Sequence, residues 1–173
     1  MRNTTPSLED QVRSIHFKYE IPKATIEELL ANGTRFLDLD KAALLSCLSG
    51  KPVEIILAMR KEDPWGRIEK KLGLTPALYH ARYIAHRAHR LHRFYGVEED
   101  RAAALLEEGY PNHWIRLAYL LEQHTGTSME TIIQQRKKSE KWKPWAEEHL
   151  HVSPEDFTAW IAETRNPSLP VKK

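Results

Sequence analysis

The residues best suited to chemistry in this sequence are basic side chains spaced along one predicted helix, residues 76–94. They recur at intervals of four, three and four, with one further arginine beside them: Arg82, His86, His89, Arg93 and Arg90. Residues three and four apart share one face of an α-helix, so these side chains form a basic face. Such a face is suited to binding an anion, either the phosphates and base edges of DNA or the carboxylates of a protein.

The basic face belongs to a segment, residues 64–94, that is similar in spacing to a helix-turn-helix. Residues 68–79 place an apolar residue, a Leu-Gly turn, a hydroxyl cap and an apolar anchor in the order of that DNA-binding motif. Two features oppose this interpretation. Glu69 stands where the helix crossing wants a small residue, and the later counterpart of Gly73 is His151, which precedes an acidic helix. DNA binding is therefore kept as the alternative interpretation.

The histidines do not predict a metal site. His86, His89 and His92 repeat every three residues, but the first and third diverge around the helix, and the neighbouring arginines repel a cation. Zinc usually takes three or four convergent ligands. We expect a solvated basic face that gains charge below about pH 6.5, with no metal and no cofactor.

No pattern for catalysis is present either. The sequence has no Gly-rich phosphate loop, no nucleophile elbow and no His-Glu-x-x-His run. Cys47 stands among leucines, which predicts a core position rather than a nucleophile. We therefore expect a protein that is not an enzyme.

Composition places the chain among ordinary globular proteins. It has 173 residues, one cysteine and a net charge of +2, and 41% of its residues are hydrophobic. No apolar run approaches the roughly 18 residues that a membrane span needs, so we expect a cytoplasmic protein with no membrane partner. Charge is uneven, because residues 19–94 carry +4 and residues 95–173 carry −3. This asymmetry suggests that one surface became specialised.

The elements that position the basic face are helices, and their pattern repeats at an offset of 76 residues. The matched positions are those that a fold needs, namely Gly stops, apolar faces and cap-Pro starts: Gly33 with Gly109, Leu45 with Leu121, Gly50 with Gly126, Ile56 with Ile132. Residues 75–76 then match 153–154 at an offset of 78. The sequence thus predicts an all-α protein made of two tandem, similar multi-helix units.

Each unit reads as five helices. We expect the first set at residues 23–31, 39–48, 52–61, 64–72 and 76–94, and the second at 98–108, 113–124, 128–138, 142–149 and 154–164. A helix capped by Ser7 precedes them. The predicted domains are an N-terminal helix (1–18), repeat 1 (19–94), repeat 2 (95–165) and a disordered tail (166–173). The long basic helix at 76–94 joins the repeats, with one apolar stripe along it: Ala77, Ala81, Ile84, Ala88, Leu91 and Tyr95.

Residues 50–57, Arg60 and the run from Trp65 to Leu74 carry a resemblance. They resemble uncharacterised bacterial helical proteins, often from Firmicutes, with an ILALR…GWGxIAxxLGL pattern. This chain departs from the pattern at Pro64, where Gly is usual, and at Glu69, where Ala is usual. The resemblance implies a bacterial helical protein and no particular activity.

The function that these observations favour is a non-enzymatic binding or scaffold module. Its partner is another protein or a second copy of the chain, because the basic face and the acidic second half are complementary in charge. The alternative is nucleic-acid binding through Arg82, His86, His89, Arg90 and Arg93 of the helix-turn-helix-like segment.

Overall fold

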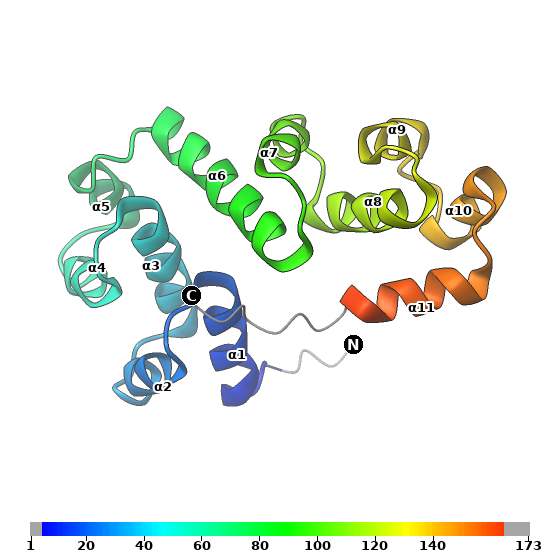
Figure 1. Ribbon diagram of the computed structural model, residues 1–173. Helices are drawn as coiled ribbons and strands as arrows, with labels where there is room; N and C mark the ends of the chain where they lie inside the picture. The colour runs from blue at the N-terminus through cyan, green and yellow to red at the C-terminus, as the bar shows by residue number, and fades with distance from the viewer. Residues whose placement is uncertain (1–4, 165–173) are drawn as a thin grey trace. The chain divides into compact units, whose positions relative to one another are not determined.

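In a computed structural model, residues 5–164 are described, and they form eleven α-helices with no strand among them (Figure 1). The chain divides into two compact units, with unit 1 ending at Tyr83 and unit 2 beginning at Ile84. The all-α prediction is therefore confirmed for the described residues. The tail predicted to be disordered, residues 166–173, lies outside them. None of the described helices is long and apolar enough to cross a membrane.

Unit 1 contains five complete helices and the first part of a sixth: α1 Leu8–Tyr19, α2 Lys23–Ala31, α3 Phe36–Ser49, α4 Val53–Arg60, α5 Trp65–Lys71 and the start of α6 Pro76–Tyr95. Unit 2 contains the rest of α6 and five more: α7 Glu99–Glu107, α8 Asn112–Thr125, α9 Met129–Gln135, α10 Trp142–Leu150 and α11 Pro154–Thr164. The division between the units thus falls within α6, whereas the sequence placed the domain boundary at its end.

Local sequence explains where several helices begin and end. The Ser7 hydroxyl accepts the backbone N–H of Asp10 at 3.1 Å, and the Ser153 hydroxyl accepts that of Asp156 at the same distance. The predicted Ser7 cap is confirmed, and Ser153 acts in the same way, since these bonds satisfy N–H groups that the first turn leaves unpaired. At the other end of α3, Gly50 has φ +75°, a left-handed conformation that glycine adopts without strain.

Two predicted boundaries are wrong. Helix α3 begins at Phe36, three residues before the predicted start, which assumed a cap at Asp38 or Asp40. Asp38 lies in the first turn instead, where its carboxylate pairs with Arg35 at 3.5 Å and Arg60 at 3.6 Å. Helix α9 ends at Gln135, three residues before the predicted end, because Arg136 turns into an extended conformation with ψ 120°.

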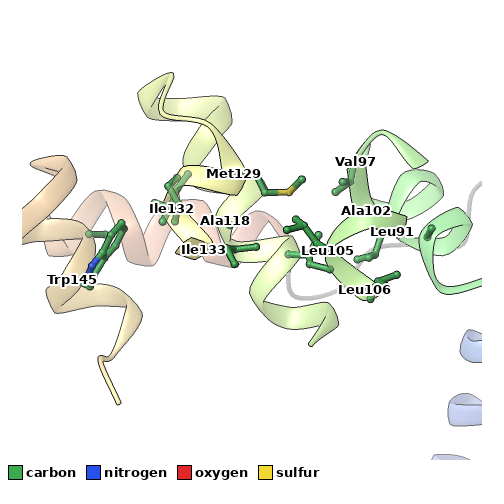
Figure 2. Close-up of a cluster of buried hydrophobic side chains, with 14 of the residues drawn as sticks. Leu91, Val97, Ala102, Leu105, Leu106, Ala118, Met129, Ile132, Ile133 and Trp145 are labelled. Carbon is green, nitrogen blue, oxygen red and sulfur yellow. The ribbon is translucent and has the colours of Figure 1, made fainter. Parts of the chain in front are cut away.

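Each unit has its own apolar core. In unit 1 the buried side chains come from α1 to α5 and the α5–α6 turn: Val12, Ile15, Ile26, Leu39, Ala42, Ala43, Leu45, Leu48, Val53, Ile56, Ile68 and Leu74. In unit 2 they come from α6 to α11, and Figure 2 shows most of them, with the Trp145 ring contributed by α10. Burial of this apolar surface is the main force that holds each unit together.

Helix α6 serves the two cores with different faces. Tyr79 and Tyr83 in its first half are half-buried and pack against the core of unit 1. Ile84, Ala88 and Leu91 in its second half are buried in the core of unit 2. The single stripe predicted along the helix is therefore wrong in its first half, where Ala77 and Ala81 are exposed. The predicted stripe assumed that the whole helix packs against one core, whereas its two halves pack against different cores.

Candidate functional site

The first of the predicted anion-binding residues, Arg82, belongs to unit 1 and already has a partner there. Its guanidinium Nη1 donates to the backbone carbonyl of Leu48 at 2.7 Å. Leu48 lies in the last turn of α3, whose carbonyls lack partners within the helix. A cation in this position also opposes the negative end of the helix dipole, so Arg82 stabilises the end of α3.

The other four predicted residues belong to unit 2 and are also engaged. The His89 Nδ1 lies 2.9 Å from the Glu99 carboxylate of α7, and the Arg90 guanidinium lies 4.7 Å from the centroid of the Phe94 ring. His86 and Arg93 are half-buried, and neither lacks a partner. The basic face exists as a run of residues, yet much of its charge is used within the protein.

The helix-turn-helix-like segment is also tied into unit 1. Helix α5 has only seven residues, and the turn after it passes through Gly73 with φ +74°. The Lys41 ammonium pairs with Glu69 at 3.0 Å and donates to the Tyr79 hydroxyl at 3.3 Å. Burial alone would lower the pKa of Lys41, but these hydrogen bonds outweigh it and raise the pKa. These contacts give Glu69 a role in joining α3, α5 and α6.

The groups considered for metal binding and catalysis do not converge. Among the described residues, no three His, Cys, Asp or Glu side chains are placed to hold a metal ion together. The prediction that Cys47 lies in the core is wrong, because this side chain is exposed on α3. Its Sγ lies 4.0 Å from the backbone carbonyl oxygen of Tyr19.

Unit 1 contains an open cleft that sequence reasoning missed. It has a volume of about 620 Å³ and lies against α2, the α2–α3 turn, α3 and α4. Its lining includes charged, polar and apolar side chains, among them Thr34, Arg35, Asp38, Glu54, Leu57 and Arg60. A second hollow of about 390 Å³ shares Arg35 and Asp38 with the cleft and is also lined by Leu37.

Unit 2 places large aromatic side chains at the matching positions. Tyr110 and Trp114 stand 76 residues after Thr34 and Asp38, and their rings stack with centroids 6.0 Å apart. The Trp114 ring then meets the edge of the Trp142 ring at 6.1 Å. Between Trp114 and Trp142 lies the buried guanidinium of Arg136, the counterpart of Arg60. Burial lowers the pKa of Arg136 from its ordinary value.

The glutamates near the cleft of unit 1 and near the aromatic cluster of unit 2 also differ in their partners. Glu130 and Glu122 of unit 2 both pair with Arg101 of α7, and the Glu122 carboxylate accepts the Met129 N–H at 3.0 Å as well. The hydrogen bonds from Arg101 lower the pKa of both carboxyls. In unit 1 the counterpart of Arg101 is Thr25, so Glu54 stays exposed at the cleft.

A signal for the cleft was present in the sequence. The two segments agree at their glycines and buried apolar positions, and the cleft lies where they disagree, at Thr34 against Tyr110 and Asp38 against Trp114. Known proteins give no further information about the cleft. No family model matches the chain, and neither the curated proteins nor the solved structures include a match.

Proposed function

We propose that the protein is a non-enzymatic binding module that contacts a protein partner through unit 1. One observation carries this proposal: Leu37 and Ile55, on α3 and α4 of unit 1, are large apolar side chains that are exposed. Single exposed apolar residues are common on protein surfaces. Here, however, Leu37 is 78% exposed and lines the hollow that adjoins the cleft, which joins an apolar contact to a recessed polar site.

The matching positions of unit 2 sharpen this contrast. Leu37 and Ile55 correspond to His113 and Thr131, which are polar. Unit 2 therefore has polar side chains at the two positions where unit 1 exposes branched apolar side chains to water. Covering such a side chain contributes roughly 1.5–3 kcal/mol, which is enough for two or three of them to anchor an interface.

We also propose that the two units are copies of one ancestral helical unit, joined within α6. Support comes from helix bounds at an offset of 76: α2 and α7 match residue for residue, as do α3 and α8. A second support is local. His16 and His92 each place Nδ1 within hydrogen-bond distance, 2.7 and 2.9 Å, of the backbone carbonyl five residues ahead, at Ile21 and Val97. A carbonyl only accepts, so Nδ1 carries the proton in both histidines.

Proximity labelling with the full chain in its native cells tests the binding proposal. The double variant Leu37→Ser with Ile55→Ser should lose the labelled partner. Leu8→Ser, which changes an exposed leucine on α1 that lines neither the cleft nor the hollow beside it, should keep it. Loss of the partner with Leu8→Ser, or its retention by the double variant, would show that the interface lies elsewhere.

Self-association is one form of the same proposal, because residues 19–94 and 95–173 differ in the sign of their charge. Light scattering at low and high salt distinguishes it from a separate partner. A second copy held by charge should dissociate as salt rises, since screening weakens exposed ion pairs. A monomer at both salt concentrations removes the self-association form and leaves the separate partner.

DNA binding through residues 64–94 is the second candidate. The observation in its favour is that α6 carries no acidic residue over its 20 residues. Affinity for duplex DNA should then fall steeply with salt and weaken in the Arg82→Ala, Arg93→Ala double variant. No binding at low salt excludes it. The contacts of Arg82 with Leu48 and of His89 with Glu99 place this candidate second.

A further inference from the structure

The α2–α3 turn of unit 1 and the α7–α8 turn of unit 2 have the same backbone hydrogen bonds. The Thr34 N–H donates to the Leu29 carbonyl at 3.1 Å, and 76 residues later the Tyr110 N–H donates to that of Leu105 at 3.2 Å. Gly33 and Gly109, just before, have φ +93° and +92°. Side chains at matched positions after these turns are therefore attached to backbone of the same local conformation.

From the same backbone, the two units project side chains of very different size. Unit 2 projects Tyr110 and Trp114, and the Trp114 ring lies 4.1 Å from the Arg136 guanidinium. Unit 1 projects Thr34 and Asp38, and leaves the open cleft of about 620 Å³. The cleft is thus the space that an aromatic pair occupies in the other unit.

Among residues 5–164, the arginine at the cleft contacts one aromatic ring, whereas its counterpart contacts two. The Arg60 guanidinium lies 5.0 Å from the centroid of Trp65, and it also pairs with Asp38 at 3.6 Å. Arg60 is half-buried, whereas Arg136, in the corner of two rings, is buried. Arginine guanidinium planes stack favourably on aromatic faces, so Arg60 offers a surface for one more ring.

We propose that the cleft of unit 1 receives a Trp or Tyr side chain of the protein partner. The ring stacks on the Arg60 guanidinium, in the role that Trp114 has toward Arg136. Its N–H or O–H donates to the carboxylate of Asp38 or Glu54 at the cleft. This inference rests on the proposed binding function and names the group that the binding site recognises.

The chemistry of the cleft favours these two side chains over other aromatic groups. Phe would stack but would offer no donor to the exposed Glu54 carboxylate, whereas Trp and Tyr combine an apolar ring with one polar tip. Charge does not decide against a nucleotide, because Arg35, Arg60 and Lys61 line the cleft beside the two carboxylates. A nucleobase is therefore the competitor that the experiment must exclude.

The probe for this test is N-acetyl-tryptophanamide, titrated into the full ¹⁵N-labelled chain and followed by amide chemical shifts. We expect saturable shifts at the amides of Thr34, Asp38 and Leu57, with a dissociation constant in the millimolar range. N-acetyl-phenylalaninamide should bind at least threefold more weakly, and adenosine should cause no saturable shift at these amides.

Two variants and a control decide whether the cleft is the site. Thr34→Tyr with Asp38→Trp fills the cleft with the residues of unit 2 and should abolish the shifts. Should that variant fail to fold, Arg60→Met, which removes only the guanidinium, should weaken binding at least tenfold. The control Lys51→Met removes an exposed cation outside the cleft and should bind as the wild type does.

Some results would overturn the inference and leave the proposed function standing. These are the absence of saturable shifts in the wild type, equal binding by the filled variant or by Arg60→Met, or tighter binding of adenosine. The labelled partner would then still depend on Leu37 and Ile55. Failure of the labelling experiment alone would remove the partner surface while the probe still reports on the cleft.

Discussion

The guanidinium of Arg136 lies 4.0 Å from the ring centroid of Trp142 and 4.1 Å from that of Trp114, in the corner formed by two indole rings whose planes are 86° apart. The same guanidinium donates to the backbone carbonyl of Glu140, which closes the loop between α9 and α10. The rings and the carbonyl replace part of the water around this buried charge, whereas its Nε is buried without a hydrogen-bond partner among the described residues. One side chain therefore joins α8, the loop and α10.

Arg136→Lys should destabilise unit 2 by about 2 kcal/mol, because an ammonium lacks the broad guanidinium plane and cannot contact both rings and the loop carbonyl at once. For a chain of this length the loss corresponds to a fall in Tm of roughly 4–8 °C. Thermal unfolding followed by tryptophan fluorescence measures it.

The matched substitution in unit 1, Arg60→Lys, should cost less than about 1 kcal/mol. Arg60 touches one ring and a partly exposed carboxylate, and ion pairs of this kind contribute little. Arg60 also donates to the Asp63 backbone carbonyl at 3.1 Å, as Arg136 does to that of Glu140, so the second ring is the main difference between the two sites. Equal losses for Arg60→Lys and Arg136→Lys would mean that the second ring contributes nothing.

Sequence reasoning located most helices because glycine stops and cap residues act locally. The bounds of α2 and α11 agree with the predicted 23–31 and 154–164. The start of α3 was missed because aspartate is a common N-cap residue, so Asp38 suggests a cap. In the structure its carboxylate pairs with Arg60, which is 22 positions away in the chain. Contacts of that range do not leave a periodic signal.

The candidate site was harder to predict. The basic face of α6 was visible as a spacing, but the partners of its charges, such as Leu48 for Arg82, come from other helices. The cleft depends on a difference in side-chain volume between Thr34 and Tyr110 and between Asp38 and Trp114. A search for shared positions passes over such differences.

His151→Gly should stabilise the protein by up to about 1 kcal/mol. His151 ends α10 with φ +56°, a left-handed conformation that costs an L-residue roughly 1–2 kcal/mol and glycine almost nothing. Its counterpart in unit 1 is Gly73 at φ +74°, whose position has open space around an added Cβ. The reverse substitution Gly73→His should therefore destabilise by a similar amount through backbone strain alone. Urea unfolding of the two variants gives both signs, and a stabilising Gly73→His would contradict this account.

Leu45→Ala and Leu121→Ala should each lower the free energy of unfolding by about 2–5 kcal/mol, because each side chain is fully buried and leaves a cavity. Leu45 belongs to the core of unit 1 and Leu121 to that of unit 2, and the two cores share no residue. Hydrogen exchange measured by mass spectrometry should thus accelerate mainly in the unit that carries the substitution. Equal acceleration in both units would show that they open together.

Unit 2 should lose stability in acid because of Arg101. Hydrogen bonds from its guanidinium lower the pKa of Glu122 and Glu130 below their ordinary value of 4.5 in the folded chain. A carboxyl with a lowered folded pKa stabilises the fold above its unfolded pKa, and this contribution is lost as pH falls through the folded pKa. The amides of α9, where the Met129 N–H donates to Glu122, should exchange faster as the pH falls below about 4.5, after correction for intrinsic exchange rates.

Glu130→Gln should reduce this pH dependence, whereas Glu54→Gln, at the matched position without the arginine, should leave it unchanged. A wild-type pH profile for α9 that Glu130→Gln does not alter would show that the pairs with Arg101 contribute no stability.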